Sequence, residues 1–165
     1  MVDRPLLDPT ALNGFPGAPF TAGVAAAAAG QIRDECAWHI APEITETVTI
    51  WTDRDAVALL PSLKVKEVLA VRDADGNAVD GWKVKSNGVL RRTSGCWPEE
   101  IEVEFTHGYE TCPSGLVAVV AERARDIKSG RVKSESLAGR SVSLDTGAGD
   151  GSTNAIAKYA LPGRP

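Results

Sequence analysis

This sequence has few of the residues from which most metal sites and nucleophilic active sites are built. Its 165 residues include only two histidines, His39 and His107, and three cysteines, Cys36, Cys96 and Cys112. An odd number of cysteines with no close pair predicts free, mostly buried thiols rather than a disulfide framework. Cys36 and His39 have a ligand-like spacing, and His107 with Cys112 could add two ligands, but structural zinc sites usually show two tight pairs. We expect no metal and no cofactor, and a zinc centre is the alternative.

No other catalytic arrangement stands out. A cysteine–histidine nucleophile pair lacks a third group to orient the histidine. Residues 147–151 resemble a phosphate loop only in glycine content, because no strand precedes them and no Lys-Ser/Thr pair follows. The glutamates at 99–100 precede an expected strand, and those at 102 and 104 lie on it. A solvent-exposed sheet face explains them more simply than the carboxylate pair of a glycosidase does. We therefore expect a protein that is not an enzyme.

The chain also lacks a long hydrophobic run and an excess of positive charge. Its longest apolar stretch, residues 24–29, is far too short to cross a bilayer, and its first residues lack the basic-then-apolar order of a signal peptide. We expect synthesis in the cytoplasm and no membrane association. The net charge of −4 is opposite to that of a typical nucleic-acid binder. It fits a conduit that DNA passes without sticking, and equally a protein that never meets DNA.

Proline and glycine dominate residues 1–19, which predicts an extended arm and not a helix. This segment and the residue after it carry apolar side chains that need a surface to cover: Leu6, Leu7, Phe15 and Phe20. Two interpretations stay open. The arm either lies as a strap over its own domain or reaches a neighbouring subunit.

A first helix is predicted from a cap at Thr21 to about Cys36. Every fourth residue on one of its faces is apolar: Val24, Ala28, Ile32 and Cys36. The alanines at 25–29 make this helix thin, and thin helices permit close axis-to-axis packing. We expect Ala27 and Ala28 at a contact between subunits of a ring, or else packed tightly within their own domain.

Residues 44–109 have the alternation and the β-branched content of strands. Asp75-Gly76 and Asn87-Gly88 are strong hairpin signals. Six short strands are predicted in a small antiparallel sheet, sandwich or barrel, at residues 44–51, 56–60, 65–72, 81–85, 89–92 and 101–105.

A second helix is predicted after Pro113, with Ser114 as its cap, ending near Lys128. Its core face is expected at Leu116, Val120, Ala124 and Ile127. Residues 130–154 are rich in glycine and small polar residues and cannot bury enough surface to offset their ordering entropy. A short amphipathic helix follows over 154–161. We expect its apolar residues Ile156, Tyr159 and Leu161 to fold against a partner.

The predicted fold class is α+β, with helices flanking a small antiparallel β-domain and with extended N-terminal and C-terminal arms. The expected organisation is an arm at residues 1–19 and a helix–β-domain–helix core at 20–129, whose β insertion spans about 44–109. A flexible arm at 130–165 with a short terminal helix completes the chain.

The order of these elements carries a resemblance to a known family. The segments that carry it run in order from residues 32–42 through 46–49, 59–65, 88–92 and 95–98 to Phe105-Thr106-His107-Gly108-Tyr109, and a helix follows Pro113. This pattern, over roughly residues 20–130, resembles the head-to-tail connector family of actinobacterial siphophages. It is more distantly similar to the adaptor proteins that form the ring beneath the portal of long-tailed phages. Residues 132–142 resemble the piece after the last core helix of that family, and we expect partner contacts at Arg131, Lys133, Glu135 and Arg140.

The resemblance implies a structural virion protein of the phage neck that forms a ring of twelve copies. Such a ring docks on the portal protein, meets a stopper or tail-completion protein below, and passes DNA without sequence-specific binding. Two other structural roles stay open. A β-domain binding module of a tail or baseplate would expose Trp51 or Trp82 on a flat face, whereas Trp38 and Trp97 are expected in the core. The second of these roles is that of the stopper below the adaptor, although stoppers are mostly β and lack two substantial helices.

Overall fold

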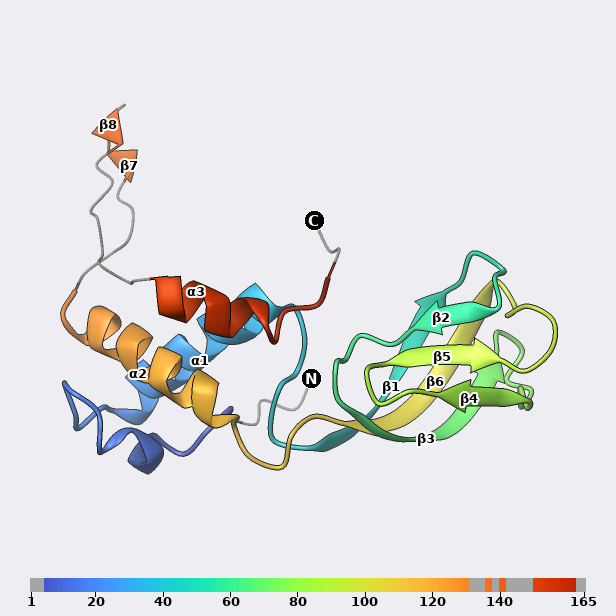
Figure 1. The fold of residues 1–165 in the computed structure, drawn as a ribbon, viewed down its shortest axis with the longest axis horizontal. Helices are drawn as coiled ribbons and strands as arrows, with labels where there is room; N and C mark the ends of the chain where they lie inside the picture. Colours follow the sequence, from blue (N-terminus) through green and yellow to red (C-terminus); the bar gives the residue numbers. More distant parts are fainter. Residues whose placement is uncertain (1–4, 131–135, 138–139, 142–149, 163–165) are drawn as a thin grey trace. The chain divides into compact units, whose positions relative to one another are not determined.

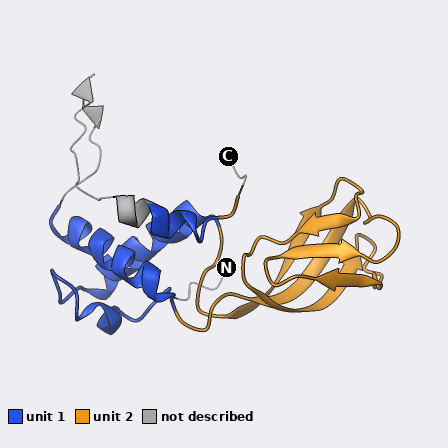
Figure 2. Ribbon diagram, in the orientation of Figure 1, with its two compact units in different colours: residues 1–37, 112–160 blue, residues 38–111, 161–165 orange. Residues whose placement is uncertain are grey.

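The computed structural model describes residues 5–130, 136–137, 140–141 and 150–162 (Figure 1). The chain forms two compact units (Figure 2): a helical unit of Met1–Ala37 and Cys112–Ala160, and a β unit of Trp38–Thr111 and Leu161–Pro165. The β unit is thus inserted between the two long helices. The expected α+β class, with helices flanking a small antiparallel β-domain, is confirmed.

The helical unit is built on two helices of equal length, α1 (Ala22–Cys36) and α2 (Ser114–Lys128). Helix α1 begins as predicted, because the Thr21 side chain accepts a hydrogen bond from the Val24 amide. The predicted cap of α2 is wrong. Ser114 is already the first helical residue, and Pro113 before it supplies no side-chain cap.

Both helices bury most of the face that their periodicity predicted, and the outermost members, Val24 of α1 and Ile127 of α2, are half-buried. Ala28, Ile32 and Cys36 of α1 are fully buried, and so are Leu116, Val120 and Ala124 of α2. An ion pair also joins the two helices, with Arg123 Nη2 2.8 Å from Glu35 Oε1. Amphipathic packing, rather than the low intrinsic helicity of a glycine-containing helix, therefore stabilises α1.

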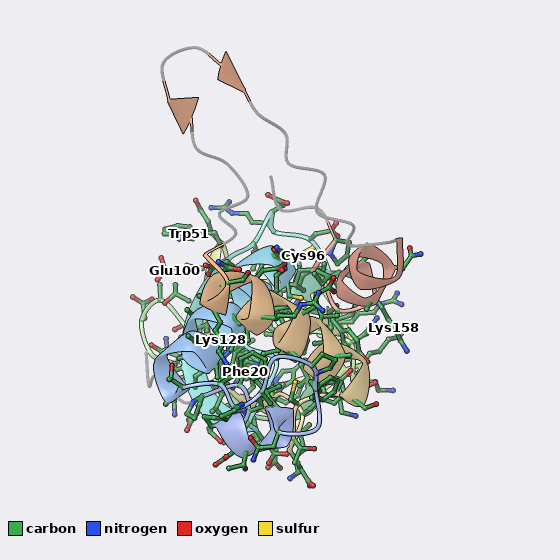
Figure 3. The ribbon with its side chains drawn as sticks, turned by 90° about the vertical axis from the view of Figure 1, so that its left-hand side faces the viewer. Phe20, Trp51, Cys96, Glu100, Lys128 and Lys158 are labelled. Carbon is green, nitrogen blue, oxygen red and sulfur yellow. The ribbon has the colours of Figure 1, made fainter. Side chains whose placement is uncertain are left out.

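The N-terminal segment lies on its own helical unit. Its buried apolar side chains are Leu6, Leu12 and Phe20. Lys128, at the end of α2, donates hydrogen bonds to the carbonyls of Gly17 (2.8 Å) and Pro19 (3.0 Å) and lies 5.6 Å from the Phe20 ring centroid (Figure 3). Residues 5–20 thus have the geometry of a strap. One short 3-10 helix, η1 (Pro9–Leu12), interrupts it where no helix was expected, because the Asp8 side chain caps the Thr10 amide.

A third helix, α3 (Asp150–Ala157), packs on α1 and α2. It begins four residues before the expected helix, and its residue Ile156 is only 8% exposed. The Ile156 carbonyl lies 4.0 Å from the Cys36 thiol, which can donate to it. This differs from the expectation that Ile156 folds against a partner. The reason is a contact between helices that are distant in sequence, which periodicity alone does not reveal.

The β unit contains two antiparallel sheets of three strands, which is the sandwich among the predicted arrangements. In one sheet the order is β1 (Ile44–Trp51), β6 (Glu100–His107), β3 (Val65–Asp73). In the other it is β2 (Val57–Leu59), β5 (Val89–Arg92), β4 (Trp82–Val84). The sheet β1-β6-β3 is called sheet A, and the sheet β2-β5-β4 is called sheet B. Their inner faces share one core, which includes Val71, Leu90, Trp97, Ile101, Val103 and Phe105.

The predicted hairpin at Asn87-Gly88 joins β4 to β5 and has a second role. Gly88 adopts a positive φ of 85°, and a Cβ there would lie 2.2 Å from the Ser62 carbonyl oxygen. The turn therefore needs glycine both for its backbone conformation and for the close approach of the loop before β3.

A two-residue pair, β7 (Ser136–Leu137) with β8 (Arg140–Ser141), is antiparallel. Among the described helices, none is long and apolar enough to cross a membrane.

Candidate interaction surfaces

The two histidines lie near each other in the β unit, with ring centroids 5.9 Å apart. His107 is fully buried, stacks on Phe105 at 4.5 Å between ring centroids, and its Nε2 lies 2.9 Å from Glu46 Oε1. Burial lowers the pKa of His107, and the neighbouring Glu46 carboxylate opposes that shift. Within the described residues, no group of three or more His, Cys, Asp or Glu side chains is placed to hold a metal ion. This cluster has the character of a packed core in which the buried His107 pairs with the half-buried Glu46.

The three thiols are free and differ in exposure. Burial raises the pKa of Cys36 to about 11, and it raises the pKa of Cys112 to about 11 as well. Both are thus protonated at neutral pH and are poor nucleophiles and poor metal ligands. Cys96 is exposed and is the exception to the expectation of mostly buried thiols. It lies in the loop between β5 and β6.

The predicted pair Ala27 and Ala28 is divided by the helix geometry. Ala28 is fully buried within the helical unit, whereas Ala27, about 100° further round α1, is exposed. Ala27 is therefore available for a partner, and Ala28 packs within its own chain.

The C-terminal residues that were predicted to contact a partner differ in their burial. Ile156 is buried on α1 and α2, whereas Tyr159 and Leu161 are half-buried. Lys158, labelled in Figure 3, lies 5.7 Å from the Tyr159 ring centroid. Arg131, Lys133 and Glu135 lie outside the described residues. Arg140 pairs with Leu137 through the β7–β8 backbone, and its side chain is not described.

The outer face of sheet A is polar and acidic. The outward side chains of β1 are Thr45, Thr47, Thr49 and Trp51, all exposed. They stand opposite Thr106, Glu104, Glu102 and Glu100 of β6, respectively. Arg72 of β3 shares its guanidinium between Glu102 (3.6 Å) and Glu104 (3.9 Å). Trp51 is 71% exposed beside Glu100 (Figure 3).

The outer face of sheet B is basic with an apolar edge. Strand β2 turns Val57 and Leu59 outward, at 39% and 67% exposure. Register places Arg91 of β5 opposite Val57 on one side and opposite Lys83 of β4 on the other. Lys85 follows on the same face, where its amide bonds the Val89 carbonyl.

The alternation of residues 101–105 predicted the acidic face, whereas the basic face was not predicted. The available signal was the alternation Trp82-Lys83-Val84-Lys85, which places both lysines on one side of a strand. The predicted core positions of Trp38 (7% exposed) and Trp97 (2% exposed) are confirmed. Trp82 is half-buried and packs on the β core.

Solved structures share this fold over most of the chain. A chain in the neck of a native GTA (gene transfer agent) particle, computed with C12 symmetry, superposes with a TM-score of 0.59 at 20% identity, covering 87% of this chain and 85% of that one. A chain in the neck of an empty GTA particle, computed with C6 symmetry, gives a TM-score of 0.56 at 19% identity, covering 87% and 80%. No protein-family model and no curated protein sequence matches this chain. The likeness is therefore one of fold.

Proposed function

We propose that this chain is a structural virion protein of the neck of a phage or phage-like particle. In this role it forms a ring of twelve copies that docks on the portal and links the DNA-filled head to the tail. The observation that carries the proposal is the shared fold with neck chains, which spans both the helical unit and the β insertion. The C12 symmetry of one of those necks supports the copy number.

The structure of the two units supports the adaptor over the stopper. Helices α1 and α2 have 15 residues each and pair along a buried face, whereas a stopper is expected to lack two substantial helices. The family of siphophage connectors that the sequence resembles stays a prediction within this proposal. So do the portal above, the stopper or tail-completion protein below, and assembly in the host cytoplasm.

We also propose that the chain has no enzymatic activity. Two of its three thiols have raised pKa values, and its buried histidine is held in a core. The net charge of −4 of the whole chain suits a passage through which DNA slides without being retained.

The experiment is deletion of the gene from a producing particle, followed by electron microscopy. We expect DNA-filled heads without tails, and restoration of tails when the intact chain is supplied in trans. A cryo-EM map of the complete particle should then place the chain between portal and tail. Normal tail joining in the deletion, or a map without the chain in the neck, would refute the proposal.

A second candidate is a carbohydrate- or receptor-binding β module, and the exposure of Trp51 favours it. Exposed aromatic rings can stack on sugars and other partners. Tryptophan fluorescence titrated with oligosaccharides tests this role, with Trp51→Ala as the control. A saturable shift in the wild type that disappears in Trp51→Ala would support the module and count against the neck ring.

A further inference from the structure

The two outer faces of the β unit carry opposite charge. Sheet A turns outward a row of glutamates on β6: Glu100, Glu102 and Glu104. Sheet B turns outward three cations on β4, β5 and the turn between them: Lys83, Lys85 and Arg91. These two sets are called the acidic face and the basic face. Acidic side chains outnumber basic ones in residues 38–111, so the basic face stands out against its surroundings.

The charges of the basic face are not neutralised within the described part of the chain. The side chains of Lys83, Lys85 and Arg91 form no ion pair or hydrogen bond with any described residue. Lys83 also stands directly opposite Arg91 across the β4–β5 pair. Like charges directly opposite each other destabilise a sheet. A local clash of this kind is relieved when an anionic surface covers both side chains.

The acidic face is likewise incompletely neutralised. Its only described cation is Arg72, which lies 3.6 Å from Glu102 and 3.9 Å from Glu104, and Glu100 has no ion-pair partner among the described residues. This face therefore keeps a negative potential in the monomer.

Both faces expose large apolar side chains beside their charges. Leu59 is 67% exposed next to the basic face, and Trp51 is 71% exposed on the acidic face. Apolar side chains rimmed by polar groups are typical of protein interaction surfaces. Contact between two such faces would remove apolar surface from water on both sides.

We propose that the acidic face of one copy docks on the basic face of the next copy around the ring. The inference rests on the proposed neck ring, because a cyclic ring needs two different complementary patches on each subunit, joined head to tail. Opposite outer faces of one two-sheet unit supply such a pair. The charges set orientation and partner choice, the apolar residues supply burial, and closure of the ring adds avidity.

DNA is a poorer occupant of the basic face. The cations form a compact patch next to the exposed aliphatic side chains of Val57 and Leu59, which offer nothing to phosphate oxygens. The complementary acidic face of the same unit repels DNA, but it attracts a second copy of this chain.

The test exchanges charges between the faces. One variant, Lys83→Glu with Arg91→Glu, has two acidic faces, and the other, Glu100→Lys with Glu102→Lys, has two basic faces. Glu104 stays in place as a partner of Arg72. Asp53→Lys with Asp75→Lys is the control for the second variant, because it changes the net charge by the same amount at exposed positions outside both faces. Circular dichroism establishes that each variant is folded.

Self-association is followed by sedimentation velocity over a wide concentration range at low ionic strength. We expect the wild type and the control to associate. For each face variant alone, we expect the dissociation constant of self-association to be about tenfold or more above that of the wild type. An equimolar mixture of the two face variants should associate like the wild type, because each offers what the other lacks.

The inference is overturned if the wild type stays monomeric throughout, or if the mixture associates no better than its components. It is also overturned if reversal of the basic face leaves association intact and instead abolishes retention on DNA. The ring location is judged separately from the particle map. A neck that contains the chain, with face variants that assemble normally, refutes only the contact between sheets. Restored association in the mixture with the chain absent from necks refutes only the neck function.

Discussion

The clearest test of the helical unit is a leucine placed at either of two adjacent alanines of α1. Ala28 has no exposed surface, whereas Ala27 is exposed, although both lie in the same run of alanines. Leucine and alanine have similar helix propensities, so the backbone preference hardly changes at either site. The comparison therefore isolates the packing of α1 on its own unit.

At Ala28 the larger side chain has no free volume to enter, since the surrounding face of α1 is buried between helices. Overpacking of this kind typically costs about 1–3 kcal/mol. In a chain of this length the melting temperature should fall by roughly 2–12 °C, at roughly 2–4 °C for each kcal/mol. At Ala27 the added side chain points to solvent, and the free energy of unfolding should change by less than about 0.5 kcal/mol.

Urea denaturation followed by far-UV circular dichroism measures both free energies, and tail joining with the same two variants reads out assembly. If Ala27 lies in a contact between subunits, Ala27→Leu should block assembly while the protein stays folded. Equal destabilisation by both substitutions, or a stable Ala28→Leu protein, would refute the packing described for α1.

Three further predictions concern the turns, the thiols and the buried histidine. Gly88→Ala should lower the free energy of unfolding by at least about 2 kcal/mol, because a positive φ and a 2.2 Å approach to the Ser62 carbonyl both oppose a Cβ. Gly76→Ala, with positive φ but nothing within 4 Å, should cost only about 1 kcal/mol in urea denaturation, and equal costs would contradict the close approach. A disulfide reagent at mildly alkaline pH should label Cys96 rapidly, and Cys36 and Cys112 only on unfolding, since burial raises the pKa of both to about 11; rapid labelling of all three in the native protein would argue against this. Burial lowers the pKa of His107, so the unfolded chain binds the proton more readily and stability should fall as the pH drops below about 6.5. His107→Gln should flatten that dependence in denaturation curves measured at several pH values, and an unchanged slope would show that other groups cause it.

The sequence by itself determined the elements and their order, because these depend on interactions between near neighbours. The alternation of apolar and polar residues, many of them β-branched, predicted both ends of β1 where they are observed. The four-residue apolar period predicted the buried face of α1. The Asn87-Gly88 pair predicted a tight hairpin, since only a residue that tolerates positive φ fits that position. The insertion of a β unit between two helices followed from the same local signals.

Tertiary structure decided what depends on contacts between distant segments. Only the register shows that Lys83 meets Arg91, and only the separation of six strands into two sheets gives the β unit an acidic and a basic face. The packing of Ile156 beside Cys36 likewise joins residues more than a hundred positions apart. Periodicity states which side of an element is apolar, but not which other element covers it. That choice follows from complementary shape and from the burial of apolar surface over the whole chain.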